Sequence, residues 1–244
     1  MSTHLFGLTK WTFAYDHSIG RNEFAGTGFR NPVDMAISDD DTVYVLNRSY
    51  ENRPDGVHVT VATLGEEYVT EFGSYGEGDG QFVWPTSIVL DKDENVYIAD
   101  EWLNRISIFN RDGEFLSKWG TPGSGNGELN KPSGLAITAD GSLLVVDSGN
   151  HRVQKFSLDG KYASQFGSQG DGAGQFNLPW SITTDKEGLI YVVDWRNDRI
   201  QQFSADGEWL ASFGSSGSGV GQFNRPSGVG VDSDGEIYVA DRQN

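Results

Sequence analysis

The sequence has 244 residues, 36% of them hydrophobic, and is long enough to bury a sizeable core. Its 35 acidic residues outnumber 18 basic ones, and the formal net charge of -17 argues against a nucleic-acid partner, whose phosphates would be repelled. Because cysteine is absent, disulfides, thiolate zinc sites and cysteine nucleophiles are excluded.

The N-terminal region has neither the charged segment nor the apolar segment of a secretory signal. The sequence contains no window of about 18 apolar residues, so we expect no membrane span. These features favour a cytoplasmic protein. The first expected element is a strand over residues 8–15, which aligns with the last strand of the units described next.

A repeat with a period of 47 residues dominates the rest of the chain. Three landmarks keep this register, which chance does not easily produce. They are the prolines Pro85, Pro132, Pro179 and Pro226, the aspartates Asp100, Asp147, Asp194 and Asp241, and the aromatic residues Phe72, Trp119, Phe166 and Phe213. Units therefore begin near residues 32, 85, 132 and 179, with a partial unit at 226–244.

Each unit predicts four short strands. In the third unit these are residues 132–138, 142–147, 151–157 and 161–167, and Asp-Gly pairs at residues 140–141 and 159–160 form turns. The first two strands are apolar and the last two alternate, as expected for a β-propeller blade whose first strand lies at the axis. We therefore predict an all-β fold, with residues 1–244 forming a single propeller domain of four-stranded antiparallel blades.

Glycine-dense linkers join the units and carry one large apolar residue each, which we expect to pack between blades. These residues are Phe82, Leu129, Phe176 and Phe223. A phosphate-binding role for the glycines is excluded, because the helix and lysine of a P-loop do not follow them.

Residues 226–244 and the third unit resemble NHL repeats in their Pro, Asp-Gly, Asp and Asn-His-Arg landmarks. The resemblance implies a propeller of typically six blades, used as an interaction platform in some proteins and as an enzyme in others. Four complete units and parts of two others indicate a truncated ring of five to six blades. A five-unit ring that closes directly is the alternative.

Each Asp that ends a second strand is followed five residues later by Arg. The pairs are Asp100 with Arg105, Asp147 with Arg152, and Asp194 with Arg199. A constellation present in every blade does the same thing in every blade, so we interpret these as structural ion pairs and not as catalytic groups.

The four histidines are the candidates for a metal site. The resemblance includes amidating lyases, in which histidines from different blades hold zinc. However, His151 occupies the repeat position of Asn104 and Asp198, and His58 aligns there when an insertion is allowed. His4 and His17 lie near the N-terminus, and no local metal-binding spacing is present. We therefore assign no metal ligand, no cofactor and no catalytic residue.

Positions at which one unit departs from the others indicate specialisation. The second strand of the first unit ends at Asn47, and about six extra residues follow it. Because linkers and the loops after second strands share one face of a propeller, we expect aromatic and basic side chains to gather there, around one mouth of the central channel. The expected ligand-binding residues are Tyr50, Trp84, Trp102, Trp180, Trp195 and Arg196, with Arg48 and Arg53 nearby.

Packing between blades is the alternative role for each tryptophan. The sequence favours a non-enzymatic scaffold that binds a protein, a peptide or a small ligand on this face. The alternative is a metal-dependent propeller lyase or hydrolase related to peptidyl-hydroxyglycine amidating lyase.

Overall fold

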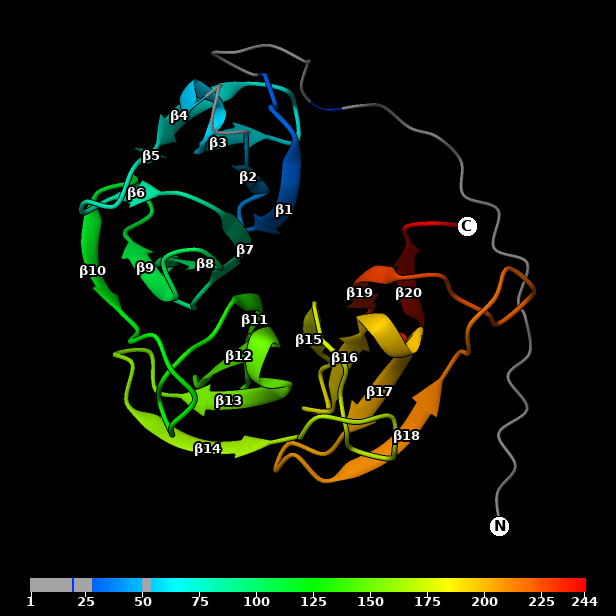
Figure 1. Ribbon diagram of the computed structural model, residues 1–244. Helices are drawn as coiled ribbons and strands as arrows, with labels where there is room; N and C mark the ends of the chain where they lie inside the picture. Colours follow the sequence, from blue (N-terminus) through cyan, green and yellow to red (C-terminus); the bar gives the residue numbers. More distant parts are fainter. Residues whose placement is uncertain (1–18, 20–27, 50–53) are drawn as a thin grey trace.

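The computed structural model describes residue 19, residues 28–49 and residues 54–244. These residues fold into successive antiparallel sheets arranged around a common axis (Figure 1). Four sheets have four strands each, and a fifth has two. The predicted all-β propeller with four complete blades is confirmed. The strand expected over residues 8–15 lies outside the described residues.

The four strands of each blade, called a to d, follow the chain from the axis outward. Blade 1 contains β1 (Pro32–Ile37), β2 (Thr42–Asn47), β3 (His58–Thr63) and β4 (Tyr68–Phe72). Blade 2 contains β7 (Pro85–Leu90), β8 (Val96–Asp100), β9 (Arg105–Phe109) and β10 (Phe115–Trp119). Blade 3 contains β11 (Pro132–Ile137), β12 (Leu143–Asp147), β13 (Arg152–Phe156) and β14 (Tyr162–Phe166). Blade 4 contains β15 (Ile182–Thr184), β16 (Ile190–Asp194), β17 (Arg199–Phe203) and β18 (Trp209–Phe213).

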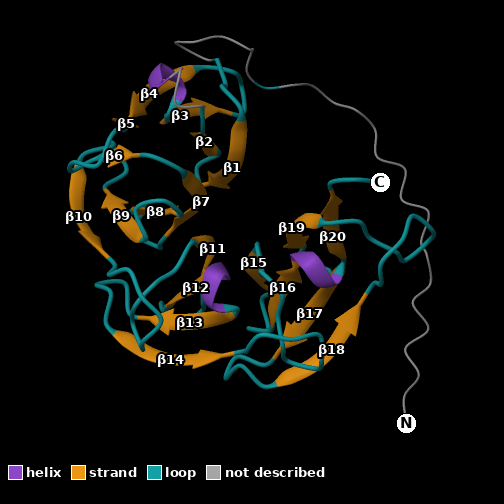
Figure 2. Cartoon of the chain, in the orientation of Figure 1, coloured by secondary structure: helices purple, strands orange, loops and turns teal. Residues whose placement is uncertain are grey.

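Strands β19 (Pro226–Val231) and β20 (Ile237–Asp241) form the fifth sheet. The remaining elements are short: the parallel pair β5 (Ser74–Tyr75) and β6 (Gln81–Phe82), and the 3₁₀ turns η1 (Pro54–Gly56), η2 (Ser148–Asn150) and η3 (Trp195–Asn197). Figure 2 shows helix only at such turns. No helix among the described residues is long and apolar enough to cross a membrane.

Burial is greatest in the second and third strands of the complete blades. Every residue of β8, β12 and β16 is buried, whereas β10 and β14 are largely exposed. Second strands are covered on both faces by neighbouring blades, so they consist of continuous apolar runs. Fourth strands have one face in water, but they do not keep the strict alternation that we expect from the sequence: β10 reads FLSKW and β14 reads YASQF.

The linker side chains pack between blades as expected. Phe82, Leu129 and Phe176 are fully buried, and each belongs to a cluster that joins two consecutive blades. Phe223 packs, partly buried, between blade 4 and the fifth sheet. Burying a side chain of this size stabilises a protein by about 1.5–3 kcal/mol, so these wedges fix the relative positions of the blades.

Two cavities involve the inner strands. One, of about 380 Å³, lies at the axis and is lined by β1, β7, β11 and β15. The other, of about 960 Å³, lies between β1 and the fifth sheet and is mainly apolar, with Val33, Met35, Val229 and Val239 in its lining. Figure 1 shows β1 and the β19–β20 pair at the two neighbouring ends of the series of sheets.

Candidate ligand-binding site

The connections between strands form two opposite faces. Pro85 pairs with Asp100 in the β7–β8 register, so the start of strand a and the end of strand b lie at the same end of the blade. The b–c loops and d–a connectors therefore form one face, here called the loop face. It comprises residues 48–49, 54–57, 73–84, 101–104, 120–131, 148–151, 167–181, 195–198 and 214–225.

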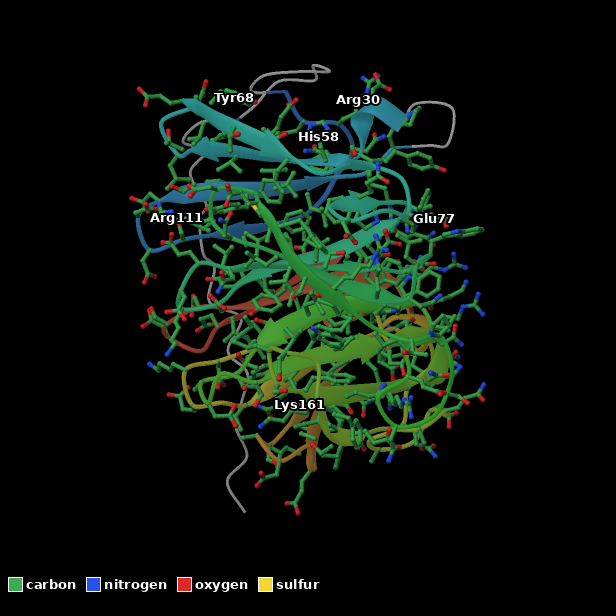
Figure 3. The ribbon with its side chains drawn as sticks, turned by 90° about the vertical axis from the view of Figure 1, so that its left-hand side faces the viewer. Arg30, His58, Tyr68, Glu77, Arg111 and Lys161 are labelled. Atoms are coloured by element: carbon green, nitrogen blue, oxygen red, sulfur yellow. The ribbon has the colours of Figure 1, made fainter. Side chains whose placement is uncertain are left out.

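The a–b and c–d turns form the other face, here called the turn face. It comprises residues 38–41, 64–67, 91–95, 110–114, 138–142, 157–161, 185–189, 204–208 and 232–236. Figure 3 shows Glu77, from the loop face, and Arg111, from the turn face, on opposite sides of the molecule.

The strand-b aspartates anchor the loop face. Asp147 accepts a hydrogen bond from the backbone N–H of Asn130 at 2.6 Å, which ties the end of strand b to the connector that enters the same blade. The same bond joins partners 17 residues apart in the other blades and the fifth sheet, at Asn47 with Arg30, Asp100 with Val83, Asp194 with Asn177 and Asp241 with Asn224. Connector and loop are therefore held together around the ring.

In blades 3 and 4 the same aspartates also pair with the arginine of strand c. Arg152 Nε lies 2.8 Å from Asp147 Oδ2, and Arg199 Nε lies 2.8 Å from Asp194 Oδ2. Both carboxylates are fully buried. Gln154 and Gln201 donate to the same Oδ2 atoms, so each charge is compensated within a hydrogen-bond network.

Blade 2 replaces this arrangement. Asp100 accepts hydrogen bonds from backbone N–H groups, including those of Val83 and Trp102, while Arg105 donates to the carbonyl oxygens of Glu77, Gly78 and Gln81. The Arg105 Nε atom and the Ser107 hydroxyl, both buried, have no hydrogen-bond partner within the described part of the chain. Here Leu103 and Ser107 stand where blade 3 has Asn150 and Gln154, so two donors to the carboxylate are missing. Blade 2 therefore lacks the ion pair that the repeat predicts, although Arg105 keeps the carbonyl contacts that Arg152 makes with Gly125 and Glu128 in blade 3.

The structure shows which repeat positions His58 and His151 occupy, whereas His4 and His17 lie outside the described residues. His151 Nδ1 accepts a hydrogen bond from the Leu178 N–H at 3.0 Å. Asn104 and Asp198 accept the equivalent backbone hydrogen bonds in the neighbouring blades. His58 pairs with Asn47 across β2–β3, as Arg152 pairs with Asp147 across β12–β13. The expected alignment of His58 with His151 is thus wrong, because His58 occupies the strand-c position of the arginines.

Trp84 and Trp102 line one cavity on the loop face. It has a volume of about 480 Å³, within the range of small-molecule sites. Trp84 comes from the connector before β7 and is half-buried, whereas Trp102 comes from the b–c loop of blade 2 and is 66% exposed. The other lining residues are Ser49, Tyr75, Val83, Glu101, Asn104, Asn130 and Lys131.

Charged groups surround the Trp84 indole. The Arg48 guanidinium carbon lies 4.4 Å from the centroid of the Trp84 ring, a cation–π contact. Lys131 Nζ lies 3.9 Å from Glu101 Oε1. Burial raises the pKa of the Glu101 carboxyl, and the nearby cations Lys131 and Arg48 partly oppose this. The cavity thus combines indole walls with one carboxyl group and nearby cations.

Trp180 and Trp195 form a second aromatic pair, in blade 4. Their ring centroids lie 6.3 Å apart. The guanidinium carbons of Arg196 and Arg225 lie 5.4 Å and 5.5 Å from the centroid of Trp195. Both arginines are exposed, whereas the two indoles are half-buried. This pair is an aromatic surface flanked by two cations.

Five of the six residues expected to bind a ligand thus fall into two groups, and the sixth is not described. Trp84 and Trp102 share a cavity, Trp180 and Trp195 contact each other beside Arg196, and Tyr50 lies outside the described residues, as does Arg53. The sequence reasoning overlooked three charged residues of these sites, Glu101, Lys131 and Arg225. Each stands beside a strand-b aspartate or an initiating proline and differs between blades, a signal already used for the tryptophans.

One carboxyl group, which the sequence analysis does not identify, lies at the axis of the propeller. Asp34 of β1 accepts hydrogen bonds from the Ser87 hydroxyl at 2.7 Å and the Ile88 N–H at 2.9 Å, which link blades 1 and 2 across the axial cavity. Burial raises the pKa of the Asp34 carboxyl, and these bonds oppose the increase. Among the described residues, no group of three or more His, Asp or Glu side chains is placed to hold a metal ion.

Comparison with known proteins supports the repeat assignment. The NHL repeat family profile matches residues 129–156, 176–203 and 223–244. These segments coincide with blades 3 and 4 and with the start of the next unit. No curated protein matches the sequence.

Several solved structures share the fold. A streptogramin B lyase matches with a TM-score of 0.63 and 14% identity, over 87% of this chain and 63% of that one. Virginiamycin B lyase from Staphylococcus aureus matches with a TM-score of 0.63 and 15% identity, over 92% of this chain and 66% of that one. A gluconolactonase from Xanthomonas campestris matches with a TM-score of 0.59 and 16% identity, over 84% and 67%. The chain spans less than two thirds of the first two structures, and these identities show the fold alone.

Proposed function

Because this chain is a β-propeller built of NHL repeats, we propose that it is a binding scaffold whose loop face holds a protein, peptide or small-molecule ligand. The observation that carries the proposal is the cavity of about 480 Å³ between Trp84 and Trp102. A largely exposed indole gains little from packing within its own chain, whereas a ligand that covers it removes apolar surface from water.

The scaffold suits this role because it is rigid beneath a variable surface. The strand-b aspartates fix each connector and each b–c loop to the blade through the same hydrogen bond, whatever side chains the loop carries. Loop side chains can then differ between blades without a change in the core, and a site held by rigid elements loses little entropy on binding. Blades 2 and 4 use this freedom to present tryptophans.

Intrinsic tryptophan fluorescence tests the proposal. The purified protein would be titrated with a fixed panel of short peptides and sugars, neutral, acidic and basic. We expect at least one member to bind the wild type and to bind Trp102→Ala or Trp195→Ala at least tenfold more weakly. Trp209→Ala is the matched control, because Trp209 is a 42% exposed tryptophan on the outer strand β18. Equal weakening by the control would contradict the proposal.

A metal-dependent lyase or hydrolase is the alternative function. Two lyases and a gluconolactonase share this fold, so the fold accommodates such an activity without specifying it. Elemental analysis of the purified protein separates the two: zinc or calcium retained in stoichiometric amounts after dialysis favours the enzyme, because a catalytic metal needs a dedicated set of ligands.

A further inference from the structure

Charge is unevenly distributed between the two faces of the propeller. Every turn of the turn face contains at least one acidic residue, and its basic residues are Lys92, Arg111, Lys161 and Lys186. On the loop face, exposed or half-buried cations lie beside the tryptophans instead. Much of the net charge of -17 is thus displaced from the aromatic sites towards the opposite face.

Two of these cations lie against one indole. Because Arg196 and Arg225 both lie within 5.5 Å of the Trp195 centroid, their guanidinium carbons are no more than about 11 Å apart, close to the Debye length of about 10 Å at 0.1 M salt. Both charges can therefore act on the same approaching anionic group, and the planar guanidinium fork matches a carboxylate.

The first aromatic site has the same character. Lys131 is 62% exposed at the cavity rim, and its acidic contact, Glu101, lies at the long distance of 3.9 Å. Arg48 stacks on the Trp84 ring, with its guanidinium carbon 4.4 Å from the ring centroid. Both aromatic sites therefore offer apolar surface next to cationic groups.

We infer that the loop face recognises an acidic peptide segment, whose carboxylates pair with Arg196, Arg225 and Lys131 while its apolar side chains cover the indoles. This inference rests on the proposed function and specifies the class of ligand. The acidic turn face supports it, because it repels such a segment and so directs it to the loop face.

A short peptide fits these observations better than a nucleic acid. The cations form two small clusters, and the connectors around them carry carboxylates such as Asp79, which pairs with Lys118 of the outer strand β10. A phosphate backbone long enough to span both clusters would also approach these carboxylates. In a peptide of alternating acidic and apolar residues only every second residue is charged, and the apolar residues can cover the indoles.

Fluorescence anisotropy with a labelled peptide of alternating Glu and Leu tests the inference. We expect binding that weakens several-fold between 50 and 200 mM salt, as a screened charge interaction does. Arg196→Gln and Arg225→Gln should each weaken binding about fivefold or more. Arg225→Lys should retain the salt dependence but lose part of the affinity, because lysine keeps the charge without the planar fork.

Two turn-face variants, Lys161→Gln and Lys186→Gln, are the controls and should leave the affinity unchanged. Circular dichroism would verify that all variants fold. The inference is overturned if a Gln–Leu peptide binds equally well, if the controls weaken binding as much as Arg225→Gln, or if a single-stranded RNA of mixed sequence binds more tightly.

These failures can be told apart from failure of the proposed function. If a neutral or basic peptide binds and loses its affinity with Trp102→Ala or Trp195→Ala, the loop face is a binding site but its ligand is not acidic. If neither these peptides nor the wider panel binds, both proposals fail.

Discussion

Arg152 donates a hydrogen bond from Nε to Asp147 Oδ2 at 2.8 Å, and both side chains lie in the interior of blade 3. Asp147 also accepts hydrogen bonds from the Asn130 N–H, Asn150 and Gln154. One buried carboxylate thus joins strand b, strand c and the connector that carries the loop face.

Asp147→Ala should lower the free energy of unfolding by about 3–5 kcal/mol, because it leaves the buried Arg152 without its anion. Urea denaturation measures this change. Lys161→Ala is the control: Lys161 is 82% exposed and pairs with Asp159 at the surface, so its loss should leave the free energy of unfolding almost unchanged. Equal costs for the two variants would show that solvent screens the Asp147 pair.

The Asp-Gly turns offer a second test, because two glycines with similar backbone angles have different surroundings. Gly141 has φ +76° and nothing within 4 Å of the point that a Cβ atom would occupy, whereas Gly160 has φ +84° and a Cβ there would lie 2.5 Å from Cγ of Trp119. Gly141→Ala should therefore cost about 1–2 kcal/mol through backbone strain alone. Gly160→Ala should cost at least about 1 kcal/mol more, because the methyl group also clashes with the indole. Equal losses in denaturation experiments would mean that Trp119 moves away freely.

Acid should weaken the a–b turn of blade 3. Hydrogen bonds from Lys155 and Thr138 hold the pKa of the Asp140 carboxyl well below its usual range. As the pH falls, the unfolded chain therefore takes up a proton first, near pH 4, and the stability from this carboxylate is progressively lost as the pH approaches the lower folded-state pKa.

The free energy of unfolding of the wild type should exceed that of Asp140→Asn more at pH 6 than at pH 2.5. Lys155→Gln should reduce the pH dependence, since it removes the main cause of the lowered pKa. Urea titrations at the two pH values measure both effects. A constant difference between wild type and Asp140→Asn would contradict the prediction.

Trp102 and Phe176 should differ strongly in their contribution to stability. Trp102 is 66% exposed, so Trp102→Ala should change the free energy of unfolding by no more than about 0.5 kcal/mol. Phe176 is fully buried between blades 3 and 4, so Phe176→Ala should cost about 3–5 kcal/mol. A large loss for Trp102→Ala would identify this residue as part of the core and would remove the main support for the binding site.

The repeat architecture could be predicted from the sequence alone. A period of 47 residues, apolar inner strands and Asp-Gly turns are local features, and each blade forms mainly from residues close together in the chain. For this reason the four complete blades and the ends of strands b at Asp100, Asp147 and Asp194 agree with the prediction. The buried linker side chains Phe82, Leu129 and Phe176 follow from the same regularity.

The contacts between residues that depart from the repeat could not be predicted from the sequence, because they depend on the tertiary structure. The pairing of Asn47 with His58 depends on the register across an insertion, which changes which residues of blade 1 correspond to those of blade 3. The meeting of Arg196 and Arg225 at Trp195 joins residues from a loop and from the following connector. Such contacts depend on the direction of side chains in space, and a sequence period specifies only the position of the backbone that carries them.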